Sequence, residues 1–208
     1  MSDIDRIIEA FELFNEKVDK LTRLSFIKAM LEPDSGVTLS WKAVESGGYE
    51  ESHERRGPEE EAIEAFVHTF RYFIQDNEIS SLRMMADHYR DAPIDNSLKK
   101  EFADVRKQIN DFLDGKSDFP IDYNGEVLTR RRIMDTFVYG GLSHATDSNT
   151  KRISEKKKLY DAWMGIPPFR PLIENEFVYT LANILDALVH IKSLNEKALA
   201  QLKSAKGT

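Results

Sequence analysis

The chain has 208 residues, of which 41% are hydrophobic and 31% are charged, and its formal net charge is −7. This composition is typical of a globular protein that buries a core, and the acidic balance disfavours non-specific binding of nucleic acid. The sequence contains no cysteine, which excludes disulfides, thiolate nucleophiles and cysteine-ligated metals.

The sequence indicates neither a membrane span nor an export signal. No run approaches the roughly 18 apolar residues that are needed to cross a bilayer. The first residues, Met-Ser-Asp-Ile-Asp-Arg, are polar and acidic, unlike a secretory signal. We therefore expect a cytoplasmic protein that has no membrane partner.

Helical periodicity dominates the chain. In three segments apolar residues recur at three- and four-residue steps, so that each set forms one stripe along a helix. The stripes contain Ile4, Ile7, Phe11, Phe14, Val18 and Leu21; Leu98, Phe102, Val105, Ile109 and Phe112; and Phe177, Leu181, Ile184, Leu188 and Ile191. Phenylalanine fills several of these positions and no segment keeps the pattern for many turns, which favours a globular bundle over a coiled coil.

Capping residues, glycines and prolines delimit the helices. The first begins at Ser2 or Asp3 and ends before Pro33. The others are predicted over 58–76, 79–90, 95–114, 128–140, 150–164 and from 171 to beyond 199. We therefore expect a mainly α fold, a single bundle-like domain over 1–208 with six or seven helices.

Two insertions interrupt the helical pattern, at 34–57 and 115–127. In the first, Val37, Leu39 and Trp41 alternate with polar residues, as in a strand. In the second, Asn124-Gly125 favours a tight hairpin. Each insertion is either a short strand pair or an irregular loop, and residues 203–208 are predicted to form a frayed tail.

The basic segment, residues 129–158, reverses the sign of the charge. It has eight basic residues against three acidic ones, a charge of +5, so the rest of the chain carries −12. This difference predicts an anion-attracting surface. Its candidate anion-binding residues are Arg130, Arg131, Arg132, Lys151, Arg152, Lys156, Lys157 and Lys158.

Each half of this segment also has a plain interpretation. Arg130, Arg131 and Arg132 lie near a helix start, where guanidinium and free N–H groups suit a phosphate or carboxylate. Consecutive helical residues, however, point about 100° apart, so the alternative is a solvated turn in which one arginine pairs with a carboxylate elsewhere. The lysines could track a nucleic-acid backbone or simply form the solvated face of a helix that docks through Ile153, Tyr160 and Trp163.

The string Gly140-Gly141-Leu142-Ser143-His144 lies between these halves. Gly141-x-Ser143 has the form of a nucleophile elbow, but that motif needs a sheet that the chain does not supply. His144 lies beside the basic residues and is a candidate acid–base or ligand-contacting group. The alternative is a joint between two helices.

Arg83-Met84-Met85-Ala86-Asp87-His88 resembles the arginine–histidine spacing of ribonucleases with the helical HEPN fold. The resemblance covers these six residues and the general helical character. It implies metal-independent RNA cleavage, in which His88 is the general acid–base and Arg83 holds the phosphate. With thirteen arginines and five histidines, about one such match is expected by chance, so this is an alternative hypothesis.

No metal or cofactor is predicted. Glu64/His68 and Asp186/His190 share helix faces, but several such pairs are expected by chance in an acidic chain. The leading hypothesis is a binding module that engages an anionic partner, such as nucleic acid, a phosphorylated ligand or an acidic protein surface, through the basic segment. The alternatives are a ribonuclease that uses His88 or His144, and an architectural module that associates with another protein or with itself as a homo-oligomer.

Overall fold

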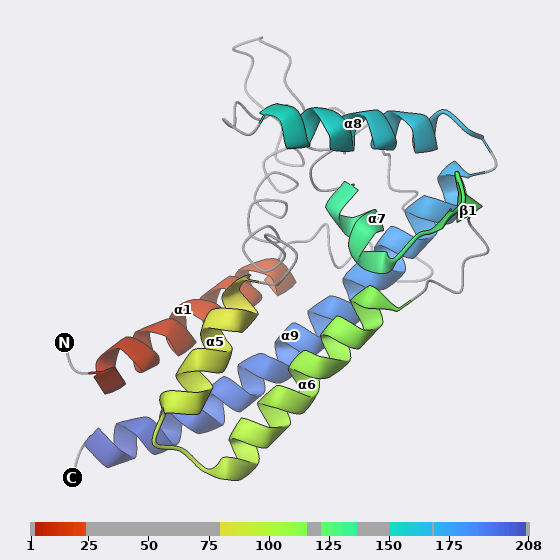
Figure 1. Ribbon diagram of the computed structural model, residues 1–208. Helices are drawn as coiled ribbons and strands as arrows, with labels where there is room; N and C mark the ends of the chain where they lie inside the picture. The colour runs from red at the N-terminus through yellow and green to blue at the C-terminus, as the bar shows by residue number, and fades with distance from the viewer. Residues whose placement is uncertain (1–2, 24–79, 116–121, 137–149, 168, 207–208) are drawn as a thin grey trace.

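The computed structural model describes residues 3–23, 80–115, 122–136, 150–167 and 169–206 (Figure 1). These residues form six helices and one short hairpin, which confirms the expected mainly α fold. The helices are α1 (Asp3–Arg23), α5 (Ser80–Asp91), α6 (Asn96–Asp114), α7 (Arg130–Thr136), α8 (Thr150–Met164) and α9 (Arg170–Lys206), and the strands are β1 (Asp122–Tyr123) and β2 (Glu126–Val127).

Several expected elements lie outside the described residues. They are the insertion at 34–57, the helix over 58–76 and the end of the 128–140 helix beyond Thr136. The assignment of 1–208 to one domain stays a prediction. The helices predicted over 79–90, 95–114, 150–164 and from 171 onward are confirmed, each to within one residue at the boundaries that were predicted.

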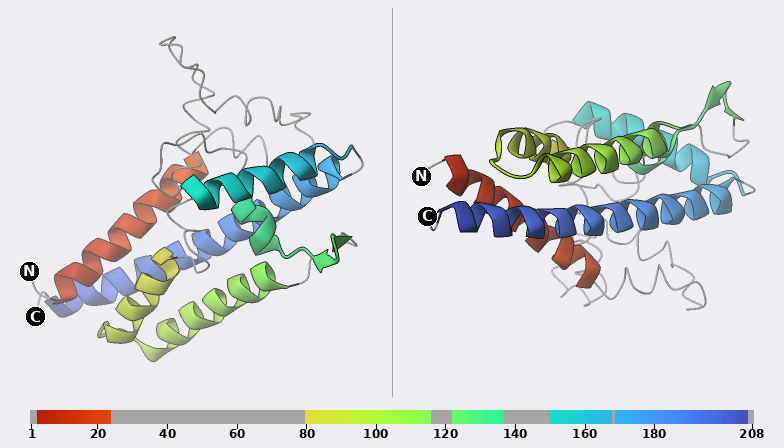
Figure 2. Two further views of the ribbon diagram at one scale, coloured as in Figure 1. Left: turned by 45° about the horizontal axis from the view of Figure 1, so that its top comes forward. Right: turned by 90° about the horizontal axis from the view of Figure 1, so that it is seen from below.

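The long helix α9 is the axis of the fold, and the other helices pack along it. It has 37 residues and contacts α1, α6, α7 and α8 (Figure 2). Helix α5 lies against both α1 and α6, and α7 and α8 pack toward the N-terminal end of α9 (Figure 1). The three apolar stripes in the sequence therefore meet in one layer of side chains.

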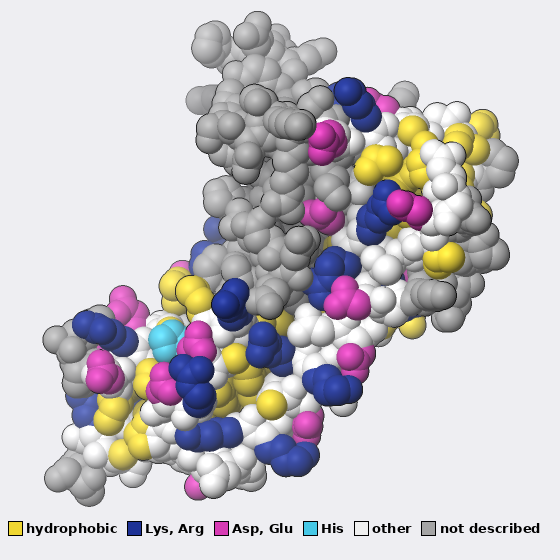
Figure 3. All heavy atoms as spheres, viewed as in Figure 1, with side chains coloured by type: hydrophobic (Ala, Val, Ile, Leu, Met, Phe, Trp, Pro, Cys, Tyr) yellow, Lys and Arg dark blue, Asp and Glu magenta, His cyan; other side chains and the backbone are white. Residues whose placement is uncertain are grey.

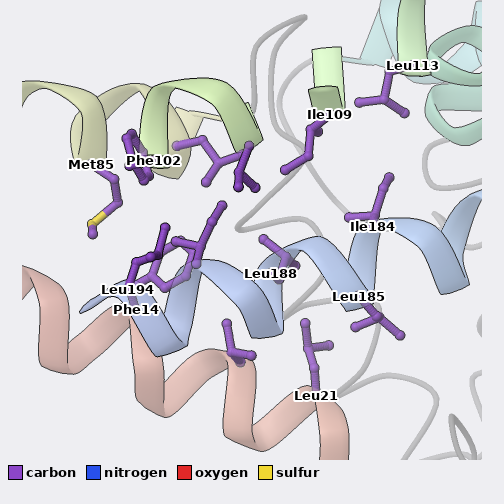
Figure 4. Close-up of a cluster of buried hydrophobic side chains, with 14 of the residues drawn as sticks. Phe14, Leu21, Met85, Phe102, Ile109, Leu113, Ile184, Leu185, Leu188 and Leu194 are labelled. Atoms are coloured by element: carbon purple, nitrogen blue, oxygen red, sulfur yellow. The ribbon is translucent and has the colours of Figure 1, made fainter. Parts of the chain in front are cut away.

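The core lies where these stripes face one another. Figure 4 shows Phe14 and Leu21 of α1 and Phe102 and Ile109 of α6 directed toward the leucines and isoleucines of α9. The stripe residues from Ile7 to Leu21, from Leu98 to Ile109 and from Phe177 to Ile191 are each at most 7% exposed. Ile4 and Phe112 are the exceptions, because both are half-buried, and Phe112 lies at the edge of the core against Tyr179.

Helices α1 and α9 run antiparallel and are joined by ion pairs along their length. Asp19 accepts from Lys192 (2.6 Å) and Glu12 from Lys203 (2.7 Å), and Lys206 pairs with Asp5. These last two pairs hold the end of α9, which stays helical to Lys206. The prediction of a frayed tail from residue 203 is therefore wrong for 203–206, because α1 supplies carboxylates that sequence position does not reveal.

Helix α6 begins and ends at the expected residues, Asp95 and Gly115. The Asp95 carboxylate does not cap its own helix. It accepts instead from the side chain of Gln201 in α9 (2.7 Å), whose amide oxygen accepts from the Asp95 backbone N–H (2.9 Å). This reciprocal pair fixes the α5–α6 turn against α9.

The Asn-Gly hairpin is present. Strands β1 and β2 pair antiparallel, with Tyr123 opposite Glu126, and the turn residues Asn124 and Gly125 have φ angles of 55° and 83°. Both angles lie in the left-handed region that a two-residue type I′ turn requires. This confirms the hairpin alternative for the second insertion.

We expect Gly125→Ala to lower the free energy of unfolding by about 1–2 kcal/mol, because a Cβ is disfavoured at positive φ. No atom lies within 4 Å of the Cβ position, so the cost comes from the backbone and not from a clash. Urea unfolding of the variant measures it. Asn124→Gly is the control and should unfold within about 0.5 kcal/mol of the parent. Equal losses in the two variants would contradict this account.

One described helix is long and apolar enough to cross a membrane by length and composition alone, over Asn175–Lys206 of α9. We expected no such run. Its fully buried residues include Leu181 and Leu188 but also the polar Thr180 and Asn195. Since α1, α6 and α7 pack on this helix, its buried apolar residues serve as those of a core helix do.

Candidate anion-binding site

The first arginine of the basic segment is buried inside the protein. The Arg130 side chain is 10% exposed and its Nε lies 2.6 Å from Oε1 of Glu176, which is 8% exposed. The guanidinium also lies 4.4 Å from the ring centre of Phe112 and 5.7 Å from that of Tyr179. Arg130 therefore joins α7 to α6 and α9 as a buried cation.

The other two arginines of the run are also paired. Arg131 binds Asp114 at the end of α6 through two nitrogens (2.5 and 3.0 Å), and Arg132 pairs with Glu126 of β2. The three arginines at the start of α7 therefore reach carboxylates on three different elements. The alternative interpretation expected one such pair and the structure has three, while the role of these arginines in anion binding stays a prediction.

The second half of the basic segment forms most of α8. Its Tyr160 and Trp163 are buried, as expected for the face that docks on the core. Lys157 pairs with Asp161 (3.1 Å), and Lys158 is exposed, with no carboxylate partner among the described residues. The side chains of Lys151, Arg152 and Lys156, and all of His144, lie outside the described residues.

The residues of the ribonuclease alternative lie on α5. Arg83 is exposed and His88 is half-buried. The helix is continuous through both, so their side chains leave it about 140° apart and do not converge on one phosphate. The ribonuclease hypothesis stays a prediction.

One member of the candidate metal pair Asp186/His190 has a partner on another helix. His190 Nε2 lies 3.1 Å from Oε1 of Glu101 on α6. Within the described ranges no group of three or more histidine, aspartate or glutamate side chains is placed to hold a metal ion. Glu64 and His68 lie outside those ranges.

The structure reveals a groove that the sequence did not suggest, between α5 and α6. Its volume is about 560 Å³. Figure 3 shows hydrophobic side chains between basic ones over these two helices. The residues that line this α5–α6 groove are Ala86, Tyr89, Arg90, Lys99, Phe102, Ala103, Arg106, Lys107 and Asn110.

Four of the lining residues are cations and none is a carboxylate. We call Arg90, Lys99, Arg106 and Lys107 the groove cations. Arg90 pairs with Asp87 and Asp91, and Lys107 pairs with Asp111. The hydrogen bonds that Arg90 donates to Asp91 and Lys107 donates to Asp111 raise the pKa of both basic side chains, so both stay charged.

The other two groove cations have no carboxylate partner among the described residues. Lys99 donates to the backbone oxygen of Arg90 (3.0 Å), which holds its ammonium between the two helices, and Arg106 is half-buried. They stand seven residues apart on α6 with Ala103 between them. Seven residues make about two helical turns and rise about 10 Å, so the two charges lie on one line along the groove.

A buried polar chain lies beneath the groove and keeps its base rigid. Tyr89 stacks on Phe102 (ring centres 4.1 Å apart) and donates its hydroxyl to Asn195 (2.8 Å). Asn195 donates in turn to Asn15 (3.0 Å). The chain ties α5 to α9 and α1, so the position of α5 relative to α6 is fixed by the core.

Burial, with the nearby Glu101 carboxylate, raises the pKa of the Tyr89 phenol. An unfolded tyrosine ionises near pH 10. Above that pH the unfolded chain loses a proton that the folded protein keeps, so stability should fall by up to about 1.4 kcal/mol per pH unit.

The test is urea unfolding of the parent and of Tyr89→Phe between about pH 9 and pH 11. Since phenylalanine does not ionise, the stability advantage of the parent should shrink as pH rises through this window. Parallel stability curves for the two proteins would show that Tyr89 does not contribute.

Comparison of the chain with protein-family models, curated proteins and solved structures gave no match. The case for a site therefore depends on the geometry of the described residues.

The signal that could have found the groove is the row beside the core stripe of α6. Lys99, Ala103, Arg106 and Asn110 follow each other at three- and four-residue steps, as the core residues do. A row with a small residue between two cations is unremarkable by itself. It becomes a site only because Ala86 of α5 faces the same groove.

Proposed function

We propose that the protein is an interaction module that engages an anionic partner, and that the α5–α6 groove is where it does so. The single observation that supports this is the lining of the groove, which holds four cations and no carboxylate on a chain whose net charge is −7. Complementary charge steers an anionic partner to such a surface and selects against cationic ones.

This proposal keeps the anionic partner that the sequence predicted, but it assigns the binding to the α5–α6 groove instead of the basic segment. In the basic segment, carboxylates already pair with Arg130, Arg131 and Arg132, and an anionic partner would have to displace those carboxylates. In the groove, Lys99 and Arg106 have no carboxylate partner among the described residues, so an anion would displace none there. The gain in charge pairing is therefore larger there.

We also propose that the protein is cytoplasmic and that it has no membrane partner. What supports this is that α9, the one described helix long and apolar enough to span a bilayer, packs against α1, α6 and α7.

Fluorescence anisotropy with labelled polyglutamate, a phosphopeptide and an RNA oligonucleotide tests the function. We expect binding of at least one of these anions at about 50 mM salt and weaker binding at about 200 mM, because added salt screens exposed charges. No binding of any anion at low salt would refute the proposed function.

Two sets of variants locate the surface. Lys99→Glu with Arg106→Glu should abolish binding, whereas Lys100→Glu with Lys197→Glu, which changes the net charge equally outside the groove, should preserve it. A third variant replaces Lys156, Lys157 and Lys158 by alanine. If it loses binding while the groove variant retains it, the partner binds α8, as the sequence predicted, and not the groove.

A further inference from the structure

We propose that the anionic partner is an acidic amphipathic helix of another protein, seated in the α5–α6 groove as a third helix. This inference rests on the proposed function and names the class of partner. It is carried by three properties of the groove, namely its length, its apolar base and the spacing of Lys99 and Arg106.

The length of the groove suits a short helix. Its lining residues on α6 extend from Lys99 to Asn110. At 1.5 Å per residue this is about 16 Å, or three turns of a partner helix lying along α6. Two packed helices present a furrow that receives the side-chain ridge of a third, which is the usual way in which a peptide helix docks.

The base of the groove suits the apolar face of such a helix. Ala86 and Ala103 come from α5 and α6, and their small side chains let another backbone approach closely. Ala103 is exposed, although α6 buries the neighbouring Phe102 to 2% exposure. An apolar ridge over Ala86 and Ala103 would remove this surface from water.

The cations suit carboxylates placed at helical spacing. Lys99 and Arg106 are one heptad apart, and glutamates one heptad apart on a partner helix have the same rise of about 10 Å. Each glutamate can therefore meet one cation while the residues three and four positions on meet the alanines. A single sequence pattern thus satisfies both the charged and the apolar parts of the groove.

Single-stranded nucleic acid fits this groove less well. Bases need exposed aromatic faces for stacking, and the two aromatic residues of the groove, Tyr89 and Phe102, are each 2% exposed and stacked on each other.

The test compares three synthetic peptides of about 15 residues, long enough to span the groove. The matched peptide has glutamates at heptad spacing with leucines three and four positions later. The second peptide has the same composition in scrambled order, and the third replaces glutamate by glutamine. We expect the matched peptide to bind at least about tenfold more tightly than either, and to gain helical circular dichroism on binding.

The outcomes separate this inference from the proposed function. Equal affinity for the matched and scrambled peptides overturns the helical partner but leaves an anion-binding module standing. Tighter binding of RNA than of the matched peptide also overturns it. If none of the peptides, polyglutamate, the phosphopeptide or RNA binds, the proposed function falls as well.

A variant that blocks the groove without changing its charge tests where the partner helix binds. Ala103→Trp fills the groove at an exposed position, so folding should be retained and affinity for the matched peptide should fall at least about tenfold. Ala200→Trp makes the same change at an exposed position of α9 outside the groove and should leave affinity unchanged. Unimpaired binding by Ala103→Trp would place the peptide elsewhere and overturn the inference.

Discussion

Arg130→Met is expected to lower the free energy of unfolding by about 3–5 kcal/mol. The substitution leaves the Glu176 carboxylate, which is 8% exposed, without the cation 2.6 Å away. It also removes the guanidinium from the rings of Phe112 and Tyr179. Urea unfolding followed by tryptophan fluorescence measures the loss.

Two further variants make this prediction specific. Arg131→Met removes an arginine whose partner, Asp114, is 59% exposed, so it should cost no more than about 1 kcal/mol. Arg130→Met with Glu176→Met removes both buried charges and should recover most of the stability lost in the single variant. A loss below about 1 kcal/mol for Arg130→Met alone would show that the buried pair does not hold α7 in place.

Phe11→Ala is expected to cost about 3–5 kcal/mol, because it deletes a fully buried ring and leaves a cavity. Phe11 is 0% exposed and lies 5.0 Å, between ring centres, from Tyr89. Its loss therefore opens the junction of α1 and α5 that supports the groove from below. Urea unfolding of the variant measures the change.

The matched control is Leu13→Ala on the same helix. Leu13 is 43% exposed, and its removal should change the free energy of unfolding by no more than about 0.5 kcal/mol. Similar losses for the two variants would contradict the assignment of one face of α1 to the core.

The helices could be predicted because local chemistry decides them. Apolar spacing fixed the buried face of α6, and Asp95 and Gly115 marked its limits correctly. Asn124-Gly125 identified the hairpin, because few other residues accept the left-handed backbone of its turn. These features depend on neighbours along the chain, which a sequence displays directly.

The site could not be predicted because its partners are distant in sequence. The charge of the basic segment is real, but Glu176, Asp114 and Glu126 come from three other elements and neutralise its arginines. Conversely, Lys99 and Arg106 sit in an ordinary charged stretch. They line a groove because α5 packs beside α6, and this packing depends on contacts distant in sequence, such as those of Tyr89 with Asn195 and Asp95 with Gln201.

The most direct test of where this protein binds is a titration with the matched acidic peptide followed by backbone amide chemical shifts. The proposal predicts that the perturbed amides map to both walls of the groove, around Ala86 and Arg90 on α5 and around Ala103 and Arg106 on α6. Perturbations confined to α7 and α8, with the groove amides unchanged, would contradict it.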